Sequence, residues 1–446
     1  MGRPSSSRNL TIWANGVRVG VWTLRPNQAM LQYDPAWLDS SLGRPLSLSL
    51  PFDLDNAPIT GPAVSAYFEN LLPDSDTIRR RIAEKFGTPS TDAFDLLKAI
   101  GRDCVGAIQI MGEDEEPQGF DRIEGIPCSE ADLDRYLTQT TAPASLRAAR
   151  DEDDDFRISL AGAQEKTAFL WHNGQWLKPT GSTPTTHIFK LPLGLMGGKQ
   201  ADFSTSVDNE WLCLKLLQAY GLPVNEADIA TFGRHRVLVV KRFDRKIADH
   251  GQWILRLPQE DFCQATGTAP TRKYQADGGP GLEQLSMILQ TSLRREQDLR
   301  TLMASQILFW LLRAPDGHAK NFSIHLSAKG RISMTPLYDV MSAYPVLGNG
   351  ANQWAPQRLR LAMAMLGKSR HDEASRIQRR HFNSTAARIG YGPDAEDLIE
   401  EIIARTPAVI AQTQASLPGD FSARVAETLL GGLEQAVAAL RSMPPT

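Results

Sequence analysis

The sequence predicts an α+β fold with two lobes: a β-rich N-terminal lobe that carries an extra α+β N-terminal subdomain, and an all-helical C-terminal lobe. Two observations lead to this prediction. Strand-like patterns recur before residue 280, whereas helical spacing of apolar residues dominates from Gly281 onward. The chain also has 446 residues, 42% of them hydrophobic, which is enough for two or three structural units with their own cores.

Residues 1–115 are expected to form the α+β subdomain. Apolar and polar residues alternate through 10–24 around Asn15-Gly16, a pattern typical of a tight β-hairpin. Helical spacing follows further on, with Asp74 and Ser75 available as caps. The other elements expected here are strands at 46–50 and 105–111 and helices at 63–72, 76–86 and 92–100.

The next stretch, residues 116–155, is expected to be an acidic connector, because prolines interrupt it and it ends in the run Asp151–Asp155. Residues 156–280 are predicted to be the β-rich part of the first lobe, and residues 281–446 the helical lobe. The expected strands are 156–160, 166–171, 187–191, 236–243 and 254–257. The expected helices are 129–139, 209–220, 299–312, 395–404, 408–416 and 421–440.

The composition excludes several classes of protein. Net charge is −3, so the overall charge does not indicate nucleic acid as the main partner. The four cysteines are widely spaced and form no CxxC pair, which is typical of reduced thiols in a cytoplasmic protein. The sequence contains no run of about 18 apolar residues, so no membrane span is expected. The N-terminus lacks a signal-peptide core. We therefore expect a cytoplasmic protein with no membrane partner.

Three oxygen-bearing side chains lie early in the predicted helical lobe. Asp316 is followed five positions later by Asn321, and Asp339 comes after a strand-like stretch. In the catalytic loop of protein kinases, an Asp at this spacing accepts the proton of the attacking hydroxyl, and the Asn and a second Asp hold magnesium. We therefore expect Asp316 to be catalytic and Asn321 and Asp339 to bind Mg²⁺, which prefers oxygen ligands. The alternative is a polar turn, since Asp-Gly is a common turn dipeptide.

An ATP-dependent kinase also needs a cation on the phosphates. Lys190 lies near the end of a predicted strand, and its apolar neighbours leave it pointing to one side, like the phosphate-binding lysine of kinases. Glu210, near the start of the next helix, is the expected carboxylate that orients Lys190, and Asp208 is its competitor. The alternatives are a surface lysine on an edge strand and a favourable charge at a helix start.

The loop at 159–166 lies between two predicted strands and has small residues at its tip, where the main chain can approach phosphate. The ATP-binding candidates in this loop are Ala161, Gly162, Ala163 and Gln164. A plain hairpin turn fits the same pattern equally well.

The strand predicted at 236–243 becomes polar at its end, as the adenine-binding hinge of a kinase does. Backbone atoms at Lys241 and Phe243 are expected to meet the base there, and the predicted ATP-binding set includes Lys241, Arg242 and Phe243, although a core strand entering a turn has the same periodicity. The predicted ATP-binding set is completed by three neighbours of the catalytic residues: His318, Lys320 and Tyr338.

Taken together, these pieces resemble the HipA family, the serine/threonine-kinase toxins of bacterial HipBA toxin–antitoxin pairs. The similarity runs from about residue 10 to about residue 420. The motifs that carry it are Ile158–Lys166, Thr185–Pro192, Ser206–Glu210, Arg242–Arg245, Leu257–Asp261, Asp316–Asn321, Pro336–Asp339 and, in the N-terminal subdomain, Phe68–Asp74 and Ile100–Asp103.

The resemblance implies a protein-kinase-like fold and an ATP- and Mg²⁺-dependent serine/threonine-protein kinase acting as the toxin of a type II pair. Members phosphorylate glutamyl-tRNA synthetase, which inhibits translation and produces growth arrest and persistence. They pair with the helix-turn-helix antitoxin HipB, and the complex represses its operon by binding operator DNA. Members also autophosphorylate a serine that matches Ser159, which ejects its loop and blocks ATP, since a phosphate adds nearly two negative charges.

This sequence departs from the family pattern in places. Lys241 stands where related chains have an acidic hinge residue, so contacts to the adenine or ribose are expected to differ. Possible DNA contacts are assigned by charge alone to Arg376, Arg379, Arg380 and Arg388, although such arginine-bearing helices are more often only solvated. The alternative functions are a HipA-like kinase with another protein or small-molecule substrate and a non-catalytic corepressor that binds its antitoxin.

Overall fold

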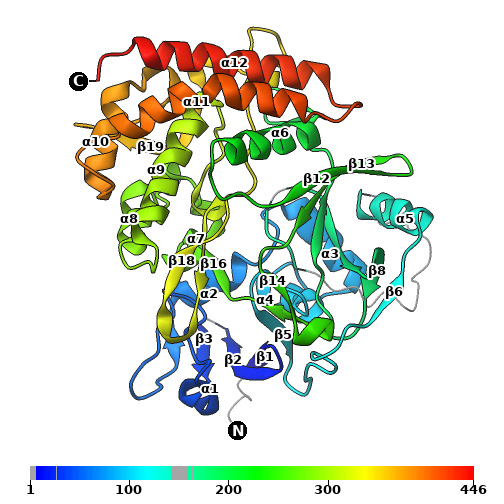
Figure 1. Cartoon of the computed structure of the whole chain (residues 1–446). Helices are drawn as coiled ribbons and strands as arrows, with labels where there is room; N and C mark the ends of the chain where they lie inside the picture. The colour runs from blue at the N-terminus through cyan, green and yellow to red at the C-terminus, as the bar shows by residue number, and fades with distance from the viewer. Residues whose placement is uncertain (1–6, 27, 142–158, 163, 446) are drawn as a thin grey trace.

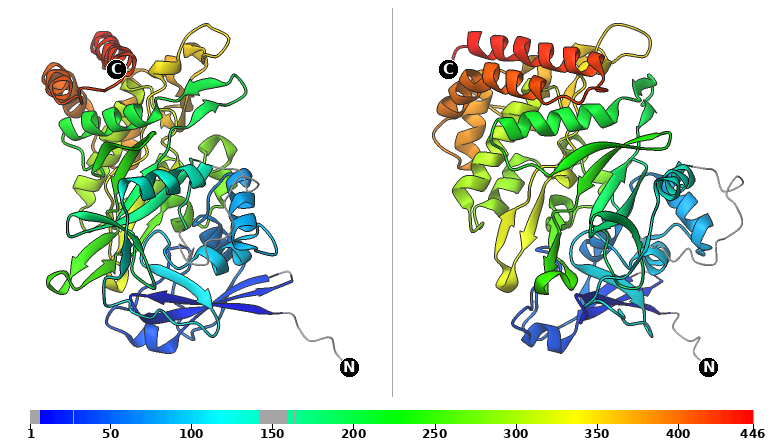
Figure 2. Two further views of the ribbon diagram at one scale, coloured as in Figure 1. Left: turned by 90° about the vertical axis from the view of Figure 1, so that its right-hand side faces the viewer. Right: turned by 45° about the vertical axis from the view of Figure 1, so that its right-hand side comes forward.

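The computed structural model describes residues 7–26, 28–141, 159–162 and 164–445. It confirms the α+β, two-lobed fold with an extra N-terminal subdomain. In Figure 1 the N-terminal strands lie at one end of the molecule and the C-terminal helices at the other, with the main sheet of the first lobe between them. The two further views in Figure 2 keep this order from end to end.

The N-terminal subdomain is a five-stranded antiparallel sheet, in the order β4-β3-β2-β1-β5, covered by short helices. Its strands are β1 (Arg8–Ala14), β2 (Val17–Arg25), β3 (Gln28–Tyr33), β4 (Ile59–Thr60) and β5 (Ile108–Gly112), and its helices are α1 (Pro35–Asp39), α2 (Pro62–Glu69), α3 (Asp76–Phe86) and α4 (Ala93–Ile100). The hairpin is confirmed, because Asn15 and Gly16 both have the positive φ that its tight turn requires. Trp22 of the sheet stacks on Phe68 of α2 in the core of this subdomain.

The strand predicted at residues 46–50 is wrong. The segment is a turn whose backbone is held by side chains instead of by a neighbouring strand. The Tyr33 hydroxyl donates to Leu50 O and accepts from the Leu46 N–H, while the Leu48 N–H donates to Glu260 from the rest of the chain. The alternation of leucines therefore reflects burial at a domain junction, where Leu46 and Leu50 enter the core of the N-terminal subdomain.

Glu260 is fully buried at this junction, and burial raises its pKa to about 8. An unfolded glutamate titrates near a pKa of about 4.3. Between these values the folded protein binds more protons than the unfolded chain, so the free energy of unfolding falls as pH rises. The side chain of Glu260→Gln stays neutral at every pH. We therefore expect its free energy of unfolding, relative to that of wild type, to rise by roughly 3 kcal/mol between about pH 5 and pH 8.

Urea unfolding of both proteins at the two pH values measures this gain. The exposed Glu226 provides a matched control. The difference in free energy of unfolding between Glu226→Gln and wild type should not rise between the two pH values. If the difference between Glu260→Gln and wild type is the same at both pH values, the carboxyl of Glu260 is ionised in the folded protein and the prediction is wrong.

The first lobe is built on a six-stranded sheet in the order β12-β13-β9-β7-β8-β6. Its strands are β6 (Gly125–Pro127), β7 (Lys166–His172), β8 (Gln175–Pro179), β9 (His187–Lys190), β12 (Ala227–Phe232) and β13 (His235–Lys241). Smaller hairpins follow this sheet: β10 (Gly194–Met196) with β11 (Ala201–Phe203), and β14 (Arg245–Ala248) with β15 (Trp253–Arg256).

The described part of the predicted connector belongs to this lobe. β6 pairs with the edge of the sheet, and α5 (Glu130–Thr141) packs Leu133 and Leu137 against Phe169 and the neighbouring core. The helix predicted at 129–139 is confirmed as α5, whereas β6 was not predicted: this part of the stretch packs into the lobe, because the helix and the short strand bury apolar residues against it. Residues 142–158, with the run Asp151–Asp155 and most of the strand predicted at 156–160, lie outside the described residues.

The second lobe is mostly helical but also contains strands, so the all-helical detail needs correction. A three-stranded sheet, β16-β17-β18, follows the loop after α9 through its strand β17, and β19 pairs with β20. The strands are β16 (Gln259–Asp261), β17 (Ser323–Leu326), β18 (Ile332–Met334), β19 (Arg360–Leu366) and β20 (Arg370–Glu373). The helices are α7 (Phe262–Ala265), α8 (Leu282–Leu289), α9 (Arg295–Leu311), α10 (Arg379–Ile389), α11 (Glu396–Ala415) and α12 (Ala423–Ser442).

Helix α9 is buried along most of its length at the centre of the largest core, as its apolar sequence predicts. α6 (Ser206–Ala219), the helix predicted at 209–220, packs on β12 and β13 and also contacts α11, so it joins the two lobes (Figure 1). The two helices expected at 395–404 and 408–416 form the single helix α11, with Pro407 inside it. Within the part of the chain that the structure describes, no helix combines the length and apolarity that crossing a membrane requires.

Candidate active site

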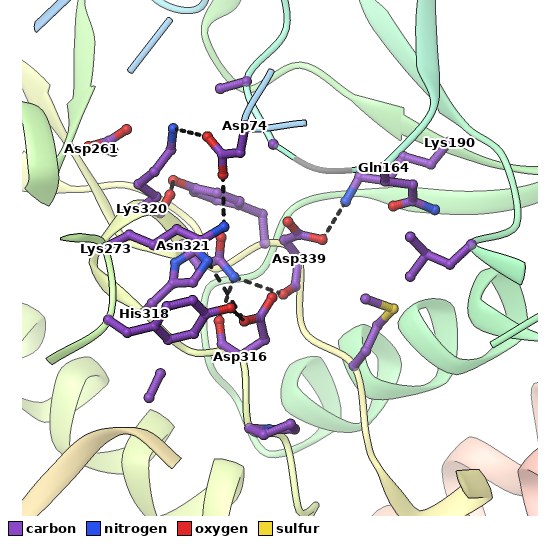
Figure 3. Close-up of a pocket in the computed structure, with 18 of the residues that line it drawn as sticks. Asp74, Gln164, Lys190, Asp261, Lys273, Asp316, His318, Lys320, Asn321 and Asp339 are labelled. Atoms are coloured by element: carbon purple, nitrogen blue, oxygen red, sulfur yellow. Dashed lines mark hydrogen bonds and ion pairs between the residues drawn. The ribbon is translucent and has the colours of Figure 1, made fainter. Parts of the chain in front are cut away.

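A cavity of about 770 Å³ lies between the two lobes. Its walls come from β9 and β13 of the first lobe, the loops before β17 and after β18 of the second, and the segment after α2 of the N-terminal subdomain. Figure 3 shows ten labelled polar residues that line this cavity, among them Lys190, Asp316, Asn321 and Asp339. Residues that are more than a hundred positions apart in the sequence therefore share one site.

The loop that follows α9 presents Asp316 to the cavity. Asn321 Nδ2 donates to Asp316 O at 2.7 Å and to Asp339 O at 3.5 Å, which brings the three residues of the predicted set together. Asp316 keeps a side chain that is 42% exposed, whereas His318, Lys320 and Asn321 are buried. The Asp316 carboxylate is thus open to a ligand, while the buried residues that follow it hold its loop in place.

Asp339 has a φ of 58°, in the left-handed region that is costly for residues other than glycine. This backbone turn follows β18 and directs the carboxylate to the first lobe, where Asp339 Oδ1 accepts from Lys190 Nζ at 2.9 Å. Burial acts to raise the pKa of Asp339, but the nearby charges of Lys190 and Lys166 outweigh it and hold that pKa well below its ordinary range.

Lys190, at the end of β9, donates to Glu210 Oε1 of α6 at 2.7 Å. The predicted pair therefore forms, and both side chains are buried. Burial acts to lower the pKa of Lys190, but Asp339 and Glu210 outweigh it and raise that pKa. Burial also raises the pKa of Glu210. Asp208, the competitor, does not reach Lys190: it lies two residues away on the same helix and accepts from Arg236 at 2.9 Å.

The loop before β7 covers one side of the cavity. Gly162 has a φ of 107°, and a Cβ atom there would come within 2.7 Å of Lys166 Nζ, so this position needs glycine. Ala161 O accepts from Lys166 Nζ, and Gln164 Nε2 donates to Leu191 O. Ala163 lies outside the described residues. The loop thus approaches the cavity with its backbone and a lysine.

The predicted hinge reaches the cavity only in part. Phe243 lines it, and its ring lies 5.8 Å from that of Tyr338. Lys241 instead points to solvent and pairs with Glu226 at 2.8 Å. The Arg242 guanidinium turns into a buried ionic cluster with Asp103 and Asp244, so contact with a nucleotide through that side chain is not supported.

Four site residues were not predicted as such. Tyr274 OH donates to Asp316 Oδ1 at 2.5 Å. Asp74 accepts from Lys320 at 2.9 Å and from Lys273 at 2.7 Å, so it is not the cap of α3, a role that Ser75 fills. The fourth is Lys166, whose pKa is lowered to about 8 by burial and then by the Lys190 charge. Asp74 and Lys166 lie in the motifs Phe68–Asp74 and Ile158–Lys166 but were assigned no role at the site, and no local pattern marks Lys273 or Tyr274.

The arginines proposed for DNA divide into two groups. Arg379 is buried and bonded to Glu396 and Glu400, so it holds α10 to α11 and is not available to DNA. Its assignment as a DNA contact is therefore not supported. Arg376, Arg380 and Arg388 are exposed, although Arg376 pairs with Glu373 and Arg388 lies 3.9 Å from Glu283.

The donor atoms suit a magnesium ion. The Asn321 amide nitrogen is occupied by two backbone oxygens, which leaves its carbonyl oxygen for a cation. One Asp339 oxygen binds Lys190, and the other is available beside it. Within the described ranges no cluster of three or more His, Cys, Asp or Glu could hold a metal. Two oxygen ligands, with nucleotide phosphates and water completing the shell, fit Mg²⁺ better than a metal that needs an all-protein cage.

Comparison with known proteins identifies the relatives of this chain. A family model described as the HipA-like C-terminal domain matches residues 158–410, and the model of the HipA N-terminal domain matches residues 10–111. The protein "Putative kinase Y4mE" of Sinorhizobium fredii is 33% identical over 76% of this chain and 79% of its own length. The serine/threonine-protein kinase toxin HipA of Shewanella oneidensis is 29% identical over 70% of this chain and 69% of its own length.

A solved structure has the same fold. It is the HipA chain of the Shewanella oneidensis toxin–antitoxin complex of HipA, HipB and operator DNA, with a TM-score of 0.76 and 23% identity, covering 98% of this chain and 100% of that chain. The C-terminal family model alone matches more than half of the sequence, and the N-terminal model accounts for the subdomain before it. This chain therefore belongs to the HipA family.

Proposed function

We propose that this chain is an ATP- and Mg²⁺-dependent serine/threonine-protein kinase that acts as the toxin of a type II toxin–antitoxin pair. The observation that carries the kinase assignment is the meeting of Asp316, Asn321 and Asp339 with the buried Lys190–Glu210 pair around one cavity. Protein kinases use these groups in the same roles. Membership of the HipA family supports the toxin role.

The chemistry follows from the contacts of each group. One oxygen of Asp316 accepts from Tyr274, so the other can accept the proton of a serine or threonine hydroxyl as it attacks phosphorus. Lys190, kept charged by Glu210 and Asp339, would neutralise phosphate oxygens. Bound magnesium would offset the negative charge of the transferring phosphoryl group. Asn321 and Asp339 would hold that ion.

The nucleotide is expected to lie along the first lobe. Ile188 and Val240 line the cavity beside Phe243 and offer an apolar surface for the adenine. The backbone around Ala161 and Gly162 would lie over the phosphates, with Lys166 next to them. Catalysis by such a site rests on positioning and electrostatics, because phosphoryl transfer needs little covalent help from the protein.

Ser159 has the surroundings of a regulatory site. Its hydroxyl is fully buried and donates to Leu71 O at 2.8 Å, and its N–H donates to Asp103 O at 3.2 Å. A phosphate with nearly two negative charges cannot be buried in that position without a partner, so a phosphorylated loop would have to leave. This supports autophosphorylation at Ser159 as a means of disabling the ATP site.

The substrate and partners are proposed through the family. We propose glutamyl-tRNA synthetase as the protein substrate, whose phosphorylation inhibits translation and causes growth arrest and persistence. A HipB-like helix-turn-helix antitoxin is the proposed partner, and the pair would corepress its operon on operator DNA. The solved relative was obtained as a complex of HipA, HipB and operator DNA, which supports this assembly.

The test is transfer of labelled phosphate from ATP and Mg²⁺ to purified glutamyl-tRNA synthetase and to the chain itself, with mass spectrometry to map the sites. We expect a labelled serine on the synthetase and label on Ser159, with growth arrest on induction in cells. In a parallel incubation with cell lysate, label found only in small molecules would indicate a small-molecule kinase. Failure to bind Mg-ATP in calorimetry would instead favour a non-catalytic corepressor.

A further inference from the structure

The segment Asn70–Asp74 of the N-terminal subdomain, called the clamp below, contacts both sides of the candidate active site. On the first-lobe side, Leu71 O accepts from the Ser159 hydroxyl, and the Asp74 N–H donates to Gly162 O at 3.1 Å. On the second-lobe side, Asn70 O and the Asp74 carboxylate both accept from Lys320 Nζ. One stretch of five residues therefore connects the loop before β7 that holds Ser159 and Gly162, called the phosphate loop, with the loop Asp316–Asn321, called the catalytic loop.

Asp74 is the charged centre of the clamp. Its carboxylate lies between the ammonium groups of Lys320 and Lys273, as Figure 3 shows, and its side chain is only 14% exposed. Burial acts to raise the pKa of Asp74, but these two lysines outweigh it and hold that pKa at about 2. Charge-assisted hydrogen bonds in such a partly buried place are stronger than those on an open surface.

Both lysines lie beside the reacting groups. Lys320 is in the same loop as Asp316, one residue before Asn321. Lys273 precedes Tyr274, whose hydroxyl bonds the Asp316 carboxylate. Without Asp74, two ammonium groups would be left partly buried next to each other, and their repulsion would displace this part of the cavity.

The clamp is also bonded to its neighbours by side chains. Arg79 of α3 donates from Nε to Pro73 O at 2.7 Å and pairs through Nη1 with Glu69 at the end of α2. The Asn70 side chain donates to Ala66 O and to Thr268 O of the second lobe. Asp74 is thus presented from a fixed position, which a residue must have if it is to hold others in place.

We propose that Asp74 is a positioning residue of the kinase, and that the clamp couples the phosphate loop to the catalytic loop. This proposal rests on the proposed kinase function. The Asp74 carboxylate holds Lys320 and Lys273, while the Asp74 backbone keeps Gly162 over the nucleotide. The N-terminal subdomain is then a part of the ATP site. Loss of the Asp74 contacts increases the mobility of the phosphate loop and of Lys320 together.

The experiment compares full-length wild type with Asp74→Asn, which keeps the shape and removes the charge. Calorimetry with the non-hydrolysable analogue AMP-PNP and Mg²⁺ gives Kd and stoichiometry, and hydrogen exchange follows the Ser159 and Asp74 amides. We expect Kd to rise about tenfold at unchanged stoichiometry, and both amides to exchange at least about tenfold faster. Asp74→Glu, which keeps the charge, should recover most of both effects.

Controls separate positioning from general damage. Asp76 is two residues further on, exposed at the start of α3, and Asp76→Asn should leave Kd and exchange unchanged. A protein that is merely less stable would bind with lower stoichiometry at the same Kd, which would overturn the proposal. Unchanged exchange in Asp74→Asn would also overturn it. A wild-type chain that binds no Mg-AMP-PNP would overturn the kinase assignment and, with it, the role of Asp74 at the nucleotide.

Discussion

Replacing Asp316 with Asn is expected to lower the rate of phosphoryl transfer by about a thousandfold, within the range that positioned general bases contribute. The amide has the shape of the carboxylate and still accepts from Tyr274, but it cannot take the proton of the attacking hydroxyl. The loop should stay folded, because Asn321 binds the backbone oxygen of residue 316 and not its side chain. Label transfer to a protein substrate measures the rate, and circular dichroism checks the fold.

Binding of Mg-AMP-PNP by Asp316→Asn should remain close to wild type, since Asp316 is assigned to the hydroxyl and not to the nucleotide. Tyr274→Phe gives a graded companion: it removes one hydrogen bond to the base and should slow transfer by about tenfold, as expected for a bond worth 1–2 kcal/mol. The matched control is Tyr220→Phe, which removes a buried hydroxyl contact with Thr406 far from the cavity. Wild-type kinetics in Asp316→Asn would contradict the catalytic assignment.

Replacing Lys190 with Met is expected to abolish transfer and also to destabilise the fold. Lys190 is bonded to Glu210 at 2.7 Å and Asp339 at 2.9 Å, and Glu210 is only 2% exposed. Removing the ammonium leaves a buried carboxylate without its cation, which typically costs about 3–5 kcal/mol. Urea unfolding measures that loss, and Mg-AMP-PNP calorimetry measures the loss of nucleotide binding.

The double variant Lys190→Met with Glu210→Gln separates the two effects. It removes both members of the buried pair, so most of the stability should return while activity stays absent. If activity returned together with stability, Lys190 would be a structural cation only. If the single variant were as stable as wild type, Glu210 would be shown to take up a proton when its partner is removed.

Much of the fold could be predicted from local pattern. The Asn15-Gly16 turn, the caps and periodicity of α3, and the apolar run of α9 specify their elements without help from distant residues. The strand expected at 46–50 failed because its leucines alternate to fill a junction, while side chains of Tyr33 and Glu260 satisfy the backbone. The strand-like stretch before Asp339 forms β17 and β18, but β16 was missed because it is three residues long and pairs with β17 from a distant segment.

In the candidate site too, some residues could be predicted from local pattern and others could not. Kinase-like spacing is sufficient to select Asp316, Asn321 and Asp339, and strand position selects Lys190 with Glu210. The prediction kept Asp208, two residues away on the same helix, as the competitor of Glu210; only Glu210 bonds Lys190, while Asp208 accepts from Arg236. Spacing could not show that the Arg242 guanidinium serves an ionic cluster with Asp103.

By itself, the sequence determined the α+β class, the family and the residues predicted to carry the chemistry, because periodicity and motif spacing are local properties of a chain. Only the tertiary structure decided that Asp74 enters the cavity between Lys320 and Lys273, and that Tyr274 holds Asp316. The Asp74 contacts join the N-terminal subdomain to residues about two hundred positions later, and the Tyr274–Asp316 contact joins segments 42 positions apart. They depend on how distant segments pack against one another, which no single segment encodes.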